Sequence, residues 1–221
     1  MTLSMQDFPA SNSPASVGSA AVAQKPTSMR ENILRAAAHL FRHRGYHGTT
    51  IRAISENVGI LSGSLFHHFE SKERILLEIM HEAAISMCAS ADVVAAADRS
   101  PIARLRGLII LQLECLLEVS TGDLFAVLIS EWREVNAPDK VPLTAFRKRY
   151  FAAWNKVLED CAQMNVLRTE PHATLFALHG AINWANTWYQ PTGRLTVPEY
   201  AGLLERMALT DTAAADRTGS D

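Results

Sequence analysis

Helical periodicity is the feature of this chain that most restricts its fold. After Thr27, almost every segment places apolar residues at i, i+3, i+4 and i+7, which is the stripe of an amphipathic helix. No run alternates strictly enough between polar and apolar residues to indicate a strand. The sequence therefore predicts an all-α protein.

Capping residues mark where several of these helices begin. Ser28 with Glu31 and Thr196 with Glu199 form S/T-x-x-E capping boxes, and Pro101 suits the first turn of another helix. Together with the periodicity, these signals predict about nine helices. We place them at residues 28–44, 50–57, 61–67, 71–97, 101–119, 122–135, 142–164, 171–189 and 197–209.

Charge is distributed unevenly along the 221 residues. The formal net charge of −2 disfavours nonspecific coating of nucleic acid. Residues 28–75 nevertheless hold seven Lys/Arg against four Glu, whereas residues 76–221 hold 13 Lys/Arg against 18 Asp/Glu. An anionic partner such as DNA is therefore expected to meet the N-terminal part of the chain.

Cysteine usage and the first residues indicate a cytoplasmic protein. Cys88, Cys115 and Cys161 lie far apart without a C-x-x-C pair, which suggests reduced thiols. Residues 1–27 lack the basic start and uninterrupted apolar run of a signal peptide. We expect residues 1–27 to be a disordered leader and residues 210–221 a disordered tail.

Two short helices joined by a tight turn differ from the others. Thr50 offers a hydroxyl cap to the first helix, and Gly59 supplies the turn. The second helix keeps Leu65 and Phe69 at i, i+4 for a core, and begins with the small residues 62–64. Small residues let backbone amides approach a phosphate or base edge, so this order suits a helix that enters the major groove by its N-terminus.

The runs Thr49–Ser55 (TTIRAIS) and Gly59–Glu73 (GILSGSLFHHFESKE) resemble the DNA-binding signature of the TetR family of transcriptional repressors. The resemblance implies a three-helix helix-turn-helix domain at residues 28–73 and a larger helical effector-binding and dimerisation domain at 74–209. It implies that Thr50 and Arg52 contact the DNA backbone. The chain departs from the family pattern at Phe66, where the family usually has Tyr. The complete set of expected DNA-binding residues is Thr49, Thr50, Arg52, Ser62, Gly63, Ser64, Phe66, His67, His68 and Lys72.

Residues 171–193 contain no Asp, Glu, Lys or Arg, which predicts a helix buried on most faces. Polar side chains within a segment barely long enough to span a bilayer disfavour a membrane helix. Burial against a second copy of the chain explains the segment better. Helices 171–189 and 197–209 are expected to form a four-helix dimer seam, as in TetR-like proteins.

A polar stripe runs along the charge-free helix. His179, Asn183 and Thr187 fall at i, i+4 and i+8, and buried polar groups need partners. Two interpretations stay open: structural partners in the other subunit, or contact with a small-molecule effector. The candidate effector-binding residues are Phe125, Trp132, Arg149, Tyr150, His179, Asn183, Trp184 and Thr187.

Asn183-Trp184 and the run Trp188–Gly193 resemble the C-terminal pattern of TetR-like repressors of fatty-acid and sterol degradation. Many of those repressors respond to acyl-CoA thioesters, so the resemblance implies an acyl-CoA effector. Its phosphates would meet Arg133, Arg147 or Arg149, and an apolar cavity would hold the acyl chain. The effector would favour a dimer whose DNA-binding units are spaced wrongly for a palindromic operator.

Two other functional classes are disfavoured. A di-iron helical enzyme needs two Glu-x-x-His motifs and two further Glu, but only Glu78 and His81 form such a motif. No phosphate-loop, zinc-protease, acyl-hydrolase or dinucleotide motif occurs, so neither enzyme activity nor a cofactor is expected. A pure interaction protein that never meets DNA is disfavoured by the positive charge at residues 28–75.

Histidines raise the question of a zinc site. His39 and His43 lie at i, i+4, with His47 just beyond, and this spacing puts two imidazoles on one helix face. The nearby sequence signals no cysteine or acidic third ligand. We therefore expect a solvated or phosphate-facing surface and no metal.

Overall fold

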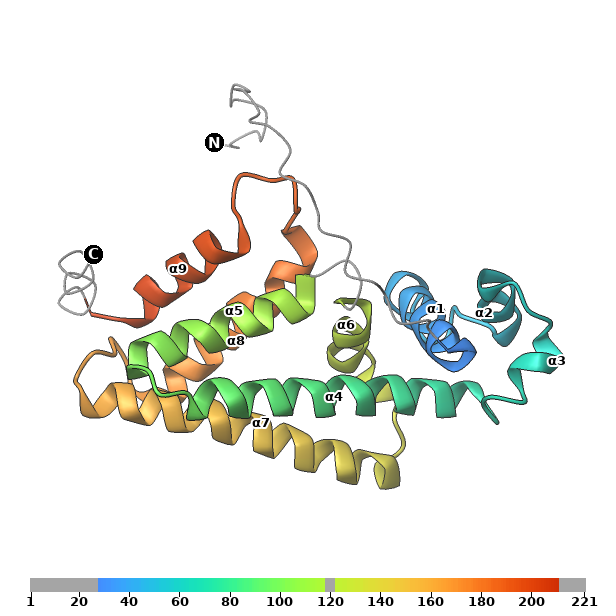
Figure 1. The fold of residues 1–221 in the computed structure, drawn as a ribbon, viewed down its shortest axis with the longest axis horizontal. Helices are drawn as coiled ribbons and strands as arrows, with labels where there is room; N and C mark the ends of the chain where they lie inside the picture. Colours follow the sequence, from blue (N-terminus) through green and yellow to red (C-terminus); the bar gives the residue numbers. More distant parts are fainter. Residues whose placement is uncertain (1–27, 118–121, 211–221) are drawn as a thin grey trace.

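The computed structural model describes residues 28–117 and 122–210 (Figure 1). In these ranges the chain is all-helical, apart from one isolated backbone bridge between Leu167 and Leu209. The expected leader and tail lie outside the described residues, except for Thr210. The helices are α1 (Met29–Arg44), α2 (Ile51–Val58), α3 (Ser62–Leu65), α4 (Lys72–Ala96), α5 (Pro101–Leu117), α6 (Gly122–Ser130), the 3₁₀ turn η1 (Glu131–Glu134), α7 (Ala137–Gln163), α8 (Pro171–Trp188) and α9 (Val197–Ala208).

The helix starts follow their capping chemistry. Both predicted capping boxes are confirmed, since Ser28 and Glu31 exchange hydrogen bonds at the start of α1, and Thr196 and Glu199 at the start of α9. At the start of α4, the hydroxyl of Ser71 accepts the backbone N–H of Arg74 at 3.1 Å. These boundaries were predictable because each depends on neighbouring residues.

Two predicted boundaries in the middle of the chain were wrong. The segment 122–135 is not one helix, because α6 ends at Ser130 and continues as η1. Helix α7 begins at Ala137 rather than at residue 142, and Pro142 lies inside it. Proline in the second turn removes one backbone donor, but α7 packs along much of α4, and this packing offsets the lost hydrogen bond (Figure 1).

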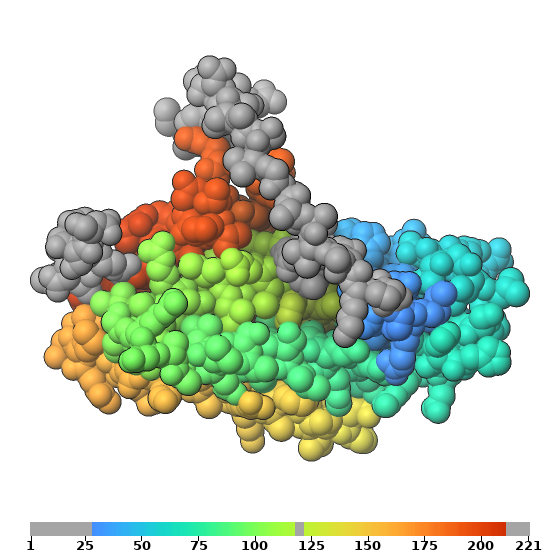
Figure 2. Space-filling view, in the orientation of Figure 1, coloured from blue at the N-terminus to red at the C-terminus, as the bar shows by residue number. Residues whose placement is uncertain are grey.

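Helix α4 connects two hydrophobic clusters. We call α1, α2 and α3 the head and α5 to α9 the body. Ile75 and Ile79 of α4 are fully buried in the cluster of the head, whereas Ala91 is fully buried in the cluster of the body. The head stands at one end of the elongated molecule, coloured blue to cyan in Figure 2.

One helix of the described residues, α4, is long and apolar enough by length and composition to cross a membrane. However, 44% of its most apolar window is buried inside the protein, where α4 packs against α1, α5, α6 and α7. Its apolar character is therefore accounted for by its place in both hydrophobic clusters.

Candidate DNA-binding surface and effector cavity

The helix-turn-helix of the head is built from short-range contacts. The Thr50 hydroxyl accepts the backbone N–H of Ala53 at 3.1 Å and caps α2. Gly59 ends α2 in the left-handed conformation, with φ of 78°, which glycine adopts without strain. The hydroxyls of Ser55 and Ser62 lie 2.9 Å apart and join α2 to α3. These contacts fix the angle between the two short helices.

The recognition segment divides into a buried and an exposed side. Leu65 and Phe69 are buried in the head, as predicted, whereas Phe66, His67 and His68 are exposed. Phe66 leaves 53% of its surface open to solvent, which is costly for a phenyl ring without a partner. The exposed aromatic and imidazole side chains therefore form a surface suited to contact another molecule.

Gly63 lies on the same exposed surface. A Cβ atom added to it would meet no other atom within 4 Å, so the fold does not itself require glycine here. Ser62 and Ser64 beside it are half-buried, and Arg52 on α2 is exposed, with its Nε donating to Glu56 Oε1 at 2.7 Å. The small surface at Gly63 leaves the backbone open to close approach.

Thr49 and Lys72 have internal partners. Thr49 is fully buried and its hydroxyl donates to the Gly45 carbonyl at 3.0 Å, so its side chain is not available to DNA in this conformation. The Lys72 ammonium donates to the carbonyls of Tyr46 and Thr49, each at 2.9 Å, and lies 4.1 Å from the Tyr46 ring centroid. Lys72 thus joins the start of α4 to the loop between α1 and α2. Its contact with a phosphate stays a prediction.

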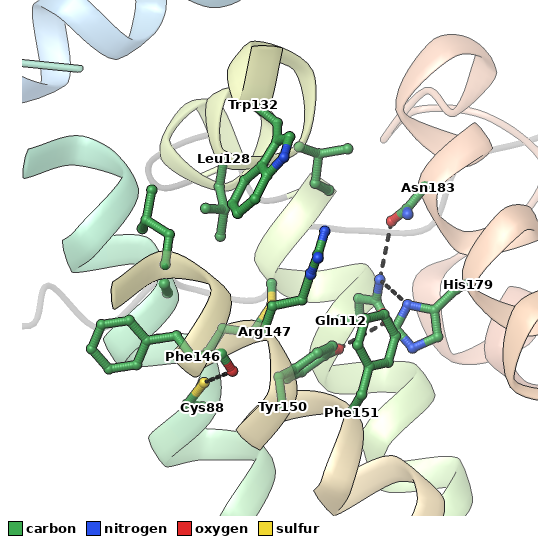
Figure 3. A pocket seen from close by; sticks show the side chains of 14 residues that line it. Cys88, Gln112, Leu128, Trp132, Phe146, Arg147, Tyr150, Phe151, His179 and Asn183 are labelled. Atoms are coloured by element: carbon green, nitrogen blue, oxygen red, sulfur yellow. Dashed lines mark hydrogen bonds between the residues drawn. The ribbon is translucent and has the colours of Figure 1, made fainter. Parts of the chain in front are cut away.

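A cavity of about 210 Å³ opens among α4, α5, α6, η1, α7 and α8 (Figure 3). Its walls are mostly apolar, with a polar group at the side formed by α5 and α8. The lining residues are Ala84, Met87, Cys88, Gln112, Leu128, Ile129, Trp132, Leu143, Phe146, Arg147, Tyr150, Phe151, His179 and Asn183. Of the predicted effector residues, Trp132, Tyr150, His179 and Asn183 line this cavity.

The other predicted effector residues lie elsewhere. Phe125 is buried in the cluster of the body, and Arg149 is exposed and paired with Asp92. Trp184 and Thr187 are exposed on α8, where Thr187 donates to the Trp184 carbonyl at 2.8 Å. In this conformation of the single chain, these four side chains do not border the cavity.

A hydrogen-bonded cluster forms the polar side of the cavity. The Tyr150 hydroxyl donates to Gln112 Oε1 at 2.9 Å, and Gln112 Nε2 donates to Asn183 Oδ1 at 3.0 Å. Gln112 Nε2 also lies 3.3 Å from His179 Nδ1. Figure 3 shows the three side chains converging on the glutamine. Gln112 was missed in the sequence, although a lone amide inside the otherwise apolar run of residues 108–113 was a signal.

Burial sets the protonation of this cluster. It lowers the pKa of His179 to about 4, because the charged imidazolium is poorly solvated there. Burial also raises the pKa of Tyr150. Both side chains are therefore neutral at pH 7. The Nε2 atom of His179 is buried and has no hydrogen-bond partner within the described chain, which is costly for a polar group.

Among the described residues that line the cavity, Arg147 is the one with a positively charged side chain. It is exposed to solvent, and its guanidinium carbon lies 4.9 Å from the centroid of the Trp132 ring. Stacking on the indole holds the guanidinium beside the opening while leaving its N–H groups free to meet an anion. The cavity thus combines an apolar wall, an uncharged polar side and a cationic rim.

Large apolar side chains on α8 and α9 face solvent. Trp184 and Met207 expose 66% and 70% of their surface, and Phe176, Trp188 and Leu203 are also exposed. A group of large apolar side chains exposed to water on one part of a protein is typical of a surface that contacts another molecule. The charge-free helix is therefore half buried in its own chain and half open.

Two parts of the sequence match known protein families. Residues 33–79 match the family described as bacterial regulatory proteins, tetR family, and residues 98–211 match the tetracyclin repressor-like C-terminal domain. The chain belongs to the TetR family. The helix-turn-helix and the all-α fold predicted from the sequence are thereby confirmed.

Individual relatives agree with this assignment. The chain is 30% identical over 175 residues to the HTH-type transcriptional repressor KstR2 of Rhodococcus jostii (strain RHA1), covering 78% of this chain and 85% of that repressor. The solved structure of the ketosteroid transcriptional regulator KstR2 of Mycobacterium tuberculosis superposes with a TM-score of 0.75 at 25% identity, covering 86% of this chain and all of that one. AibR, solved in complex with isovaleryl coenzyme A and operator DNA, shares the fold, with a TM-score of 0.73 at 22% identity over 82% of this chain and 98% of AibR.

The family consists of transcriptional regulators, so the expectation that this chain is not an enzyme is confirmed. The Glu-x-x-His motif that suggested a di-iron bundle is taken up by structural contacts. Glu78 forms an ion pair with Arg30, and the His81 ring packs edge-on against Phe146, with centroids 6.1 Å apart.

Proposed function

We propose that this repressor binds a palindromic operator as a homodimer in the cytoplasm, and is released by a short acyl-CoA thioester that enters the cavity. The observation that carries the effector assignment is the make-up of the cavity: apolar walls, the neutral Gln112 cluster on one side and Arg147 at the rim.

The size of the cavity supports an acyl group rather than a whole coenzyme. Its 210 Å³ lies below the range of about 300–1,000 Å³ that is usual for drug-sized ligands. The acyl chain would occupy the apolar space and the coenzyme would extend outward. Arg147, and then the exposed Arg133, would meet the coenzyme phosphates at the rim.

Hydrogen-bond chemistry supports a carbonyl group at the inner end of the ligand. The amides of Gln112 and Asn183 and the imidazole of His179 are neutral donors and acceptors, so they suit a thioester carbonyl better than a free carboxylate. The complex of AibR with isovaleryl coenzyme A is a precedent for this ligand class on the same fold.

The dimer is supported by the exposed apolar side chains on α8 and α9. Joining these faces from two chains would cover Phe176, Trp184 and Met207 in a four-helix seam. Two-fold symmetry would present two copies of the segment 62–68 to DNA, about 34 Å apart, which is one turn of the double helix. The operator would then be a palindrome.

Calorimetry with the purified protein tests the effector. In a series of acyl-CoAs from acetyl to palmitoyl we expect heat from the short-chain members, and no comparable binding of free CoA or of the matching free fatty acids. The same acyl-CoAs should lower the affinity for a fluorescent DNA fragment from the repressor's own promoter. Absence of heat from every chain length would overturn the acyl-CoA proposal, and binding without loss of DNA affinity would overturn its role as the releasing signal.

A further inference from the structure

Three candidate metal ligands from distant parts of the sequence meet where the head contacts the body. His39 and His43 lie one turn apart on α1, and Asp123 lies in the first turn of α6, 84 residues after His39. One ligand atom of each lies within 4.8 Å of the others. The sequence shows only the two imidazoles, and the fold adds the carboxylate.

The surroundings already orient these groups. The Nδ1 atom of His43 lies 2.8 Å from the His39 carbonyl oxygen, and a carbonyl can only accept, so His43 carries its proton on Nδ1 and leaves the Nε2 lone pair free. Arg42 Nη1 donates to Asp123 Oδ1 at 2.9 Å. The other carboxylate oxygen, Asp123 Oδ2, lies 2.9 Å from His39 Nδ1. A backbone carbonyl behind a histidine and a donor behind a carboxylate are the usual supports of metal ligands.

We propose that His39, His43 and Asp123 bind a divalent transition-metal ion, Zn²⁺ in particular. Two imidazoles and one carboxylate are a ligand set that zinc uses when it keeps a further position for water. Zinc bonds of about 2.0–2.1 Å place tetrahedral ligands about 3.4 Å apart, so a ligand separation of 4.8 Å must close by about 1.4 Å, whereas His39 Nδ1 and Asp123 Oδ2 are already 2.9 Å apart. Both imidazoles are exposed, so a small change of their side-chain torsions can make this adjustment without moving the core.

The position of the site gives the ion a physical consequence. It would cross-link α1 of the head to α6, and the other end of α6 supplies Leu128 and Ile129 to the cavity. An ion that binds only the native arrangement stabilises it, by an amount that rises with the ratio of the free ion concentration to the dissociation constant. The head would therefore be held more firmly against the body in the presence of zinc. This site is independent of the effector and the operator proposed above.

Calorimetric titration of the EDTA-treated full chain with zinc chloride tests the site, with cobalt chloride as a spectroscopic probe. We expect one ion per chain, a visible absorption of the cobalt form that is typical of nitrogen and oxygen ligands, and a rise of the melting temperature with added zinc. H43Q should weaken binding by more than about tenfold, because it removes a ligand while disturbing only an exposed side chain.

A second variant and a control complete the experiment. D123N should weaken binding similarly, whereas H47Q should bind zinc like the original protein, because His47 pairs with Glu134, 2.6 Å away, outside the cluster. Melting curves of the metal-free variants should show a cooperative transition, which would establish that the variants are folded. No zinc binding by the original chain, or equal binding by H43Q, would overturn the proposal. Loss of binding in H47Q as well would place the ion elsewhere and overturn it too.

Discussion

Tyr150 and Gln112 join α7 to α5 at the wall of the cavity, through a hydrogen bond of 2.9 Å from the tyrosine hydroxyl to the glutamine oxygen. The amide nitrogen of the same glutamine donates to Asn183 on α8. One buried side chain therefore links three helices, and it orients the polar groups that a ligand would meet.

Replacing Gln112 with Leu should destabilise the fold, because the buried hydroxyl of Tyr150 and the Asn183 amide lose their partner. We expect a loss of about 1–3 kcal/mol in the free energy of unfolding, measured by urea denaturation. E114Q, at an exposed position of the same helix, is the matched control and should unfold like the original protein. An unchanged midpoint for Q112L would show that the cluster contributes nothing to stability.

Acid should destabilise the protein through His179. Its pKa is about 4 when folded and about 6.5 when unfolded, so between these values the unfolded chain binds more protons and stability falls as the pH falls. We expect His179 to remove about 2 kcal/mol on going from pH 8 to pH 5. H179Q should lack this component, so its melting temperature should depend less on pH. An identical pH dependence in both proteins would contradict the lowered pKa.

Substitution of Gly63 should separate DNA binding from folding. G63A should keep the melting temperature, since the added Cβ meets nothing within 4 Å, while operator affinity falls by about tenfold if DNA approaches the backbone there. G63L should weaken DNA binding further at similar stability. Fluorescence anisotropy with operator DNA measures the affinity of both variants, and thermal melting measures their stability. Unchanged affinity for G63L would remove this position from the DNA interface.

Charge on the α8 surface should disrupt the dimer. W184E introduces a carboxylate where 66% of an indole is exposed, and we expect monomers in light scattering after gel filtration. V93E alters a side chain that is 72% exposed on α4, so it is the matched control and should stay dimeric. A dimeric W184E would place the interface on another surface.

Lys72 should contribute to the stability of the head, because its ammonium donates hydrogen bonds to two carbonyls of the loop between α1 and α2. K72A should lower the free energy of unfolding by about 1.5–3 kcal/mol, the range for hydrogen bonds to charged groups. The effect of K72A on the salt dependence of operator binding tests whether Lys72 also contacts a DNA phosphate. A slope reduced by about one means that Lys72 also neutralises a phosphate, and an unchanged slope leaves it a purely structural residue.

Local chemistry explains why much of the fold was predictable. The caps at Ser28, Thr50 and Thr196, the turn at Gly59 and the buried position of Leu65 all depend on residues within about one helical turn. The start of α7 was missed because the penalty for Pro142 inside a helix is offset by packing against α4, which no local pattern reveals.

The cavity was only partly predictable, because periodicity groups residues onto a face without saying what that face meets. His179 and Asn183 line the cavity, whereas Thr187 and Trp184 on the same helix face solvent. Gln112 and Asp123 join their partners across 67 and 84 residues of sequence. Such pairings arise only when the helices are packed, so the sequence showed the polar stripe of His179 and Asn183 but neither its pairing with Gln112 nor the carboxylate beside His39.

Because Lys72 holds two carbonyls of the loop between α1 and α2, a tilt of α4 would be transmitted directly to the head. Cys88 of the cavity wall lies along α4 at about 24 Å from Lys72, at 1.5 Å per residue. A tilt of α4 by about 8° about Cys88 would displace Lys72 by about 3.4 Å, which is the rise of a DNA strand per nucleotide along the helix axis. In the dimer proposed above, a tilt of that size in each chain would shift each DNA-binding segment by about one base pair, and an effector that favours the tilted form would weaken operator binding.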